Sequence, residues 1–291
     1  MKKPMVSVVM ITYKHEAFIR EAIEGVLMQE CDFDVELIIA DDGSPDDTSS
    51  IVQNIISTHP KGHWIKYTRH QENKGMMPNF IWSLQQCKGK YIALCEGDDY
   101  WIDPLKLQKQ VDFLEENKEY SMCFTNRKML INNNFIDQLS EESEYITQDI
   151  YSGFIPSTQT IVFRTNSLNA NLLSTYNSPS GDRLLCFILS LDGKIKKLNF
   201  TSAIYRYTED GIWSSFDYET QQYKSLQRLF DFKNNIADPI LSDSKIIISR
   251  KKFYFSVLKR VVFQLKKYNF RIAFKLYIIF LINIFRNKQN I

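Results

Sequence analysis

Short apolar runs alternate with helical patterns over the first 125 residues, and no other feature of the sequence constrains the fold as strongly. Four runs have the apolar, β-branched composition of buried strands: Val6–Thr12, Val35–Ala40, Trp64–Thr68 and Tyr91–Cys95. Strands that alternate with helices form a parallel sheet with right-handed crossovers. The sequence therefore predicts an α/β fold with a mostly parallel sheet flanked by helices.

The segments between these runs have the spacing of amphipathic helices. Apolar residues recur three and four positions apart from about Glu16 to Gln29. A second helix is predicted to begin at Asp47 or Thr48, either of which can cap it, and a third to span Phe80–Cys87. These helices supply the crossovers that the parallel sheet requires.

Acidic side chains follow two of the predicted strands at the point where each strand ends. Asp41 and Asp42 close the second run, and Glu96, Asp98 and Asp99 follow the fourth. Ligands of open α/β sheets bind beyond the carboxyl ends of the strands. Carboxylates this close together repel one another, which raises the pKa of at least one of them unless a cation neutralises the site. Mg²⁺ and Mn²⁺ are suitable cations because they prefer oxygen ligands. The alternative is a solvated turn, since Gly-Asp-Asp also suits a tight turn.

The same edge of the sheet lacks the motifs that hold phosphate directly, because neither GxxxxGK[ST] nor GxGxxG occurs in the sequence. A phosphate ligand beside two acidic clusters therefore needs a bridging cation. Thr12 adds a third polar strand end. Together these strand ends suit a nucleoside diphosphate whose charge is screened by a divalent cation.

Four motifs, in this order and spacing, resemble glycosyltransferase family 2. They begin at Val6, Ile38, Asn73 and Gly89 and read VSVVMITYKHE, IIADDGSPDDT, NKG and GKYIALCEGDDYW. The resemblance covers roughly residues 5–215. It implies a GT-A fold, a nucleotide-sugar donor, a divalent cation (Mn²⁺ or Mg²⁺) and inversion at the anomeric carbon.

The resemblance also implies roles for individual residues on the donor side. Asp98 is the expected metal ligand, and Asp99 is expected to support it. Glu96 stands where the family has Asp, and its extra methylene shifts the carboxylate outward. The expected nucleotide-binding residues are Thr12, Tyr13, Asp41, Asp42, Asn73, Gly75, Glu96 and Gly97.

Inverting transfer also needs a general base that takes the proton of the acceptor hydroxyl. Asp182 is the candidate, because it precedes an apolar helical pattern at a position comparable to that of the base in the family. The alternative is that Asp182 only caps this helix. Trp213 and Ser214 are expected on the acceptor side, and Thr208 stands where related sequences often carry His.

The C-terminal segment has a charge pattern of its own. From Ser244 to the end there are 12 Lys or Arg and no Asp or Glu, although the net charge of the chain is only +2. Such a basic, aromatic segment can lie on an anionic membrane or form a structural helical hairpin. Its last apolar run is shorter than the roughly 20 residues that span a bilayer. No nucleic-acid-binding module is visible, and residues 1–243 are acidic.

Cysteine and histidine usage indicates neither disulfides nor a zinc site. The five cysteines have no CxxC spacing, which favours reduced thiols in the cytoplasm. The N-terminus lacks the pattern of a signal peptide. The histidines have no metal-ligand spacing and are predicted to lie at the surface; they are His15, His59, His63 and His70.

The sequence thus predicts a cytoplasmic, metal-dependent glycosyltransferase, peripheral on the membrane through 244–291. Its acceptor is expected to be a cell-envelope or lipid-linked glycan. A catalytically silent nucleotide-sugar-binding protein and a glycoside hydrolase are the alternatives. We expect three parts: a nucleotide-sugar-binding half (1–126), an acceptor-binding half (127–220) and a basic helical extension (221–291).

Overall fold

The protein divides into two compact units whose chain segments interleave. The first comprises Met1–Tyr145, Pro156–Asn177 and Ile188–Tyr207; the second comprises Ile146–Ile155, Ser178–Phe187 and Thr208–Ile291. The division into three functional parts with boundaries at 126 and 220 remains a prediction. The computed structural model describes residues 3–175, 178, 180–208, 211, 215–242, 244–267 and 270–288, without the side chains of 265–267, 270, 271 and 284–288.

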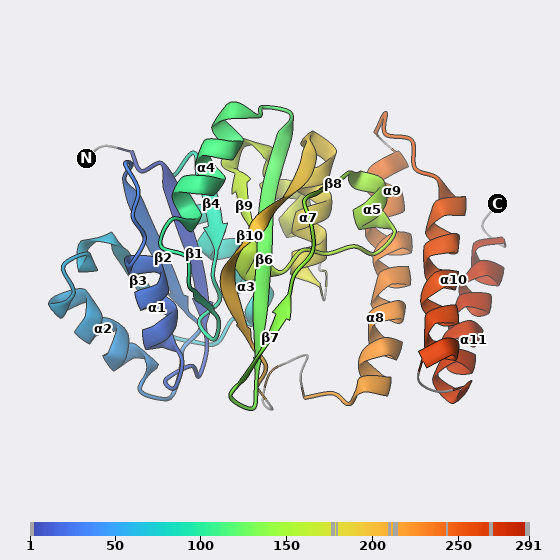
Figure 1. Ribbon diagram of the computed structural model, residues 1–291, viewed down its shortest axis with the longest axis horizontal. Helices are drawn as coiled ribbons and strands as arrows, with labels where there is room; N and C mark the ends of the chain where they lie inside the picture. The colour runs from blue at the N-terminus through green and yellow to red at the C-terminus, as the bar shows by residue number, and fades with distance from the viewer. Residues whose placement is uncertain are drawn as a thin grey trace. The chain divides into compact units, whose positions relative to one another are not determined.

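Four parallel strands form one part of the sheet in the first unit (Figure 1). They are β1 (Val6–Thr12), β2 (Val35–Asp41), β3 (Ile65–Arg69) and β4 (Tyr91–Leu94), in the spatial order β3-β2-β1-β4. β1 pairs in parallel with both β2 and β4, and β2 pairs in parallel with β3. The predicted parallel arrangement is confirmed, and the carboxyl ends of β1, β2 and β4 lie at one edge.

The helices that follow these strands agree with the apolar stripes in the sequence. They are α1 (Ile19–Leu27), α2 (Thr48–Thr58), α3 (Met76–Gln86) and α4 (Lys106–Glu116). The third helix begins one turn before the predicted Phe80. Gly75, with φ +87°, precedes it, and this left-handed conformation lets the chain turn sharply into the helix.

Strands of both directions complete the sheet. β9 (Val162–Arg164) is antiparallel to β4 and to β6 (Tyr120–Ile131), whereas β6 and β10 (Lys194–Arg206) are parallel. β5 (Tyr100–Trp101) and β8 (Ser143–Tyr145) pair antiparallel with β10, and β7 (Asn134–Gln138) forms a hairpin with β6. The sheet is therefore mixed. Short helices in this unit are Gly62–Trp64, Thr158–Thr160, Thr165–Ser167 and α6 (Ala170–Thr175).

The second unit is helical. Its helices are α5 (Thr147–Tyr151), the first residues of α7 (Gly181–Asp192), α8 (Tyr218–Phe232) with a π-helical continuation (Lys233–Ala237), α9 (Asp238–Ser242), α10 (Arg250–Lys267) and α11 (Phe270–Lys288). The predicted C-terminal helices are thus confirmed. Among the helices that the structure describes, none combines the length and apolarity needed to cross a bilayer.

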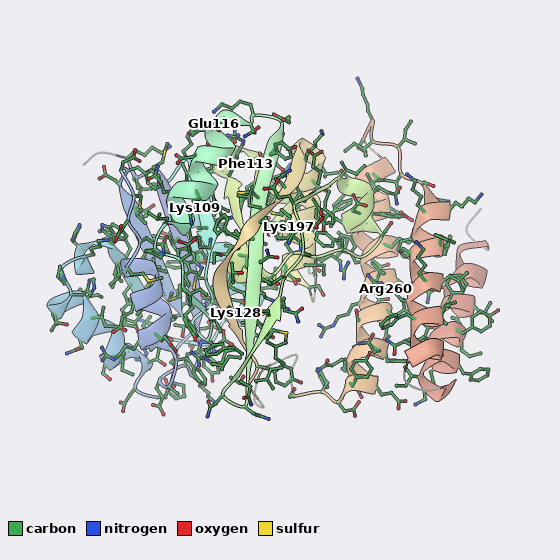
Figure 2. The ribbon with its side chains drawn as sticks, viewed as in Figure 1. Lys109, Phe113, Glu116, Lys128, Lys197 and Arg260 are labelled. Atoms are coloured by element: carbon green, nitrogen blue, oxygen red, sulfur yellow. The ribbon has the colours of Figure 1, made fainter. Side chains whose placement is uncertain are left out.

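Aromatic contacts hold α10 within the second unit. The Phe253 ring lies 5.4 Å from that of Phe230 on α8 and 5.3 Å from that of Tyr151 on α5. Arg260, labelled in Figure 2, donates a hydrogen bond of 2.8 Å to the Gly153 carbonyl. α11 joins this packing through Phe280, whose ring lies 6.0 Å from that of Tyr254.

Lys106 is a buried charge in the core of the first unit. It is fully shielded from solvent, its ammonium donates to Gln110 Oε1 at 2.7 Å, and it lies 4.2 Å from the centre of the Trp101 ring. Burial lowers its pKa to about 7, although the nearby Cys123 and Cys95 thiols and Asp103 oppose the shift.

This burial predicts a pH-dependent stability. Between the folded pKa of about 7 and the ordinary value of 10.5, the unfolded chain binds more protons at Lys106, so stability rises with pH. Relative to Lys106→Met, the wild type should gain about 1 kcal/mol of unfolding free energy per pH unit from about pH 7 to about pH 9. Urea denaturation of both proteins across this range measures the difference. Parallel pH profiles would contradict it.

Candidate functional site

Asp42 joins the end of β2 to the loop that precedes α3. Its amide donates to the Thr12 carbonyl at 2.9 Å. Its Oδ1 accepts from the Lys74 amide at 2.7 Å, and its Oδ2 accepts from the Gly75 amide at 2.9 Å. The sequence motifs at Thr12, Asp42 and Gly75, far apart in the chain, therefore meet at one edge of the sheet.

Asp41 is turned into the protein. It is fully buried, its Oδ1 accepts from the Ser44 amide at 2.8 Å, and its Oδ2 accepts from the Tyr67 hydroxyl at 2.7 Å. Arg69 Nε lies 4.0 Å from the same Oδ2. Asp41 thus fixes the turn after β2, whereas the neighbouring Tyr13 is exposed, with the Lys14 ammonium 5.2 Å from its ring.

Three carboxylates converge directly after β4. Glu96, Asp98 and Asp99 each offer an oxygen, and these oxygens lie within 4.8 Å of one another. Glu96 and Asp98 are half-buried, whereas Asp99 is only 1% exposed. Burial, followed by the charges of Asp98 and Glu96, raises the pKa of Asp99 well above its ordinary value. Adding a positive charge here would relieve this repulsion.

Asp99 is held by a segment far along the chain. Its Oδ1 accepts from the Arg206 amide at 2.8 Å, and the Arg206 Nε donates to the Asp98 carbonyl at 3.0 Å. Arg206 also forms an ion pair with Glu21. The other oxygen of Asp99, Oδ2, is buried and has no hydrogen-bond partner in the structure. The backbone of this cluster is therefore fixed, while one carboxylate oxygen is left for a further partner.

Gly97 lets the carboxylate turn approach the end of β1. Its amide donates to the Ile11 carbonyl at 3.0 Å. A Cβ at this position would lie 2.7 Å from Thr12 Oγ1 and 2.8 Å from His15 Nδ1. These two side-chain atoms are themselves 3.2 Å apart. Only glycine fits at position 97, and its lack of a side chain lets Thr12 and His15 pack against the turn that carries the carboxylates.

Asp182 lies in the second unit, in the first turn of α7. Its Oδ1 accepts from the Arg183 amide at 2.8 Å, a hydrogen bond to the next residue of the same helix. The Arg183 side chain is 4% exposed, and its Nε and Nη1 have no hydrogen-bond partner. Burial lowers the pKa of Arg183 to about 10, an effect that Asp182 opposes and Arg260 reinforces. Trp213 and Ser214 lie outside the described residues.

Sequence comparison identifies the family of this chain. A model for "Glycosyl transferase family 2" matches residues 7–171, more than half of the 291 residues. The chain belongs to glycosyl transferase family 2. The resemblance of the four motifs is thereby confirmed.

Curated relatives of this family 2 chain extend the match. An uncharacterized protein of Mycobacterium tuberculosis is 33% identical over 223 residues, which are 72% of this chain and 60% of the relative. The chain thus spans about 60% of that relative's length. The Escherichia coli enzyme WfaP, a UDP-Glc:alpha-D-GlcNAc-diphosphoundecaprenol beta-1,3-glucosyltransferase, is 29% identical over 205 residues, which are 69% of this chain and 77% of WfaP.

Solved structures share the fold. S. aureus TarS 1–349 in complex with UDP-GlcNAc has a TM-score of 0.58 at 18% identity, covering 88% of this chain and 80% of that one. The mannosyltransferase PcManGT of Pyrobaculum calidifontis, in complex with GDP-Man and Mn²⁺, has a TM-score of 0.57 at 13% identity, covering 100% and 83%. This likeness confirms the predicted GT-A-like sheet with flanking helices.

The carboxylate cluster fits a hard divalent cation. All three side chains supply oxygen, which Mg²⁺ and Mn²⁺ prefer. The unpartnered, buried Oδ2 of Asp99 leaves an acceptor for a cation, and the pKa of this group stays raised although the charge of Arg127 lowers it in part. Within the part of the chain that the structure describes, no other group of three such residues is arranged this way.

The histidine prediction was wrong for His70, which is 7% exposed. Its Nε2 lies 2.9 Å from Asn79 Oδ1, and Asn79 in turn donates to the Ala40 carbonyl at 2.9 Å. His15 is half-buried beside Gly97 and was not predicted as a site residue. Its position three residues after Thr12, within the first motif, could have indicated that it lies near the site. No sequence pattern around Arg206 indicated its contact with Asp98 and Asp99.

A substitution at Gly97 tests the close approach of the two strand ends. In Gly97→Ala, the added methyl group would overlap Thr12 and His15, so the turn has to shift. We expect the unfolding free energy to fall by about 1–3 kcal/mol, the usual effect of overpacking a buried position. Chemical denaturation measures this loss. An unchanged unfolding free energy would show that the turn has room that the structure does not indicate.

Proposed function

We propose that this chain transfers a sugar from a nucleoside-diphosphate sugar to an acceptor hydroxyl with inversion at the anomeric carbon. The observation that carries the proposal is the convergence of Glu96, Asp98 and Asp99 within 4.8 Å at the edge of the sheet where Thr12 and Asp42 lie. The solved relatives' complexes with UDP-GlcNAc and with GDP-Man and Mn²⁺ support a donor of this class.

Asp98 is the proposed ligand of the divalent cation. Asp98 is half-buried, whereas Asp99 is buried and tied to the Arg206 amide, which suits a supporting role for Asp99. Glu96, with its longer side chain, is proposed to face the ribose or a cation-bound water. The cation, when bound, stabilises the negative charge that develops on the departing diphosphate.

The loop held by Asp42 is proposed to bind the nucleotide. Each Asp42 carboxylate oxygen accepts one amide hydrogen bond and keeps a lone pair for a donor on the base. Thr12, Asn73 and Gly75 flank this position, and exposed Tyr13 offers a face for stacking. Asp41 is proposed to act through the turn that it stabilises, because both its oxygens accept internal hydrogen bonds.

Asp182 is the proposed general base. As the acceptor oxygen forms its bond to the anomeric carbon, the hydroxyl proton passes to the Asp182 carboxylate, and the bond to the donor's diphosphate breaks with its electron pair. The hydrogen bond from the Arg183 amide to Oδ1 fixes the orientation of the carboxylate without neutralising it. Trp213 and Ser214 are proposed to contact the acceptor.

The acceptor is proposed to be a lipid-linked or cell-envelope glycan. The support is the similarity to WfaP, whose name gives a diphosphoundecaprenol-linked sugar as its acceptor. Such an acceptor would place the reaction at the cytoplasmic face of a membrane.

The proposal is tested by incubating the protein with a panel of nucleotide sugars, with and without Mn²⁺. Metal-dependent release of nucleoside diphosphate, faster with a lipid-linked acceptor, is the expected result. A thermal shift without turnover would favour a silent binder. Release of sugar from a glycan without any nucleotide response would favour a hydrolase and overturn the proposal.

Asp182→Asn separates catalysis from donor binding. The amide cannot accept the hydroxyl proton, so turnover should fall at least about a hundredfold while donor binding persists. The matched control is Asp231→Asn, an exposed aspartate on α8. Steady-state rates and donor titration measure the two effects. Full turnover in Asp182→Asn would disprove the assignment of the base.

Asp98→Ala tests the cation site. Removing the carboxylate should abolish the Mn²⁺-dependent part of donor binding and leave the metal-independent part in place. Asp112→Ala, at an exposed position of α4, is the control. Calorimetric titration with the nucleoside diphosphate, with and without Mn²⁺, distinguishes the two. Equal Mn²⁺ dependence in the wild type and in Asp98→Ala would exclude Asp98 as the ligand.

A further inference from the structure

We propose that the outward faces of α10 and α11 form a surface that binds anionic lipid bilayers. This outer face is defined by six exposed residues: Lys251, Lys252, Phe255, Lys259 and Phe263 on α10, and Phe274 on α11.

Large apolar side chains are exposed on both helices. Phe255 is 57% exposed, Phe263 51% and Phe274 55%. Soluble proteins seldom expose apolar side chains in contiguous rows, and such rows mark contact with another protein or a membrane. The outer face therefore has the composition of a contact surface.

The exposed residues form a stripe on each helix, opposite its buried stripe. On α10 the buried stripe includes Phe253, which contacts Phe230 of α8, and Gln264, which donates to the Tyr218 hydroxyl at 3.0 Å. α11 is tied to α8 by the ion pair between Lys275 and Glu219. The exposed stripe of α10 therefore faces away from α8, and on α11 the exposed residues lie opposite the buried Ile272, Leu276 and Ile279.

The charge of this face identifies the partner. No Asp or Glu occurs in α10 or α11, and Lys251, Lys252 and Lys259 lie among the exposed aromatic residues. The Lys259 ammonium lies 4.8 Å from the centre of the Phe255 ring, so the charge and the apolar surface are interleaved. Two copies of such a face would repel each other, whereas an anionic bilayer would attract the lysines and accept the aromatic rings.

The geometry suits a helix that lies in the bilayer interface. A helix in that plane buries its apolar face at the headgroup boundary while lysine side chains reach the headgroups. Neither α10 nor α11 is apolar enough to cross a membrane within its described residues. The proposed contact is therefore peripheral and reversible.

Vesicle flotation of the full chain tests this surface. Vesicles of phosphatidylcholine alone are compared with vesicles that also contain phosphatidylglycerol. We expect binding to the second kind only, weakened by salt. The triple variant Lys251→Gln, Lys252→Gln, Lys259→Gln should lower partitioning about a hundredfold. The triple variant Phe255→Ser, Phe263→Ser, Phe274→Ser should lower it by about tenfold or more. These exposed substitutions leave the buried stripe intact.

The matched control is Phe135→Ser on β7, where the side chain is 59% exposed but lies in the first unit. It should bind vesicles as the wild type does. Absence of wild-type binding to phosphatidylglycerol vesicles, or wild-type binding by both triple variants, would overturn the proposal. The proposal would also be overturned if the wild type did not bind vesicles but formed a dimer in sedimentation velocity, and if the triple phenylalanine variant were monomeric. Donor turnover is not the readout, so these results do not depend on the proposed function.

Discussion

Three carboxylates are held close together at the end of β4, and the candidate site of the first unit is built around them. Glu96, Asp98 and Asp99 lie within 4.8 Å of one another, and the pKa of Asp99 is raised because the group is buried beside two others. Hydrogen bonds that involve the backbone keep the cluster in place. The Arg206 amide holds Asp99, and Gly97 packs the turn against Thr12. A cluster of carboxylates that is fixed in this way suits a bound cation.

The sheet brings Thr12 and Asp42, which are proposed to bind the donor, to the same edge. The parallel pairing of β1 with β2 and β4 aligns their carboxyl ends, and Asp42 then draws in the loop at Lys74 and Gly75. A carboxylate cluster that can hold a cation and an acceptor-rich loop thus lie on one edge, which suits the proposed binding of a nucleoside diphosphate. The membership of the chain in glycosyl transferase family 2 agrees with such a site.

The sequence predicted the parallel strands because their signals are local, and it missed features that depend on distant contacts. Apolar runs and helical stripes located β1 to β4 and α1 to α3, with α3 one turn longer because Gly75 can adopt φ +87°. Burial of His70 depends on its hydrogen bond to Asn79, which no spacing rule indicates. The support of Asp99 by Arg206 joins residues 107 positions apart, and the parallel pairing of β6 with β10 is equally non-local.

Anomalous diffraction from crystals grown with Mn²⁺ and a nucleoside diphosphate would show whether the carboxylate cluster binds the cation. We expect an anomalous peak that contacts the Asp98 carboxylate beside Glu96 and Asp99, with the diphosphate oxygens completing the coordination. A diphosphate bound through basic side chains, with no peak at this cluster, would contradict it.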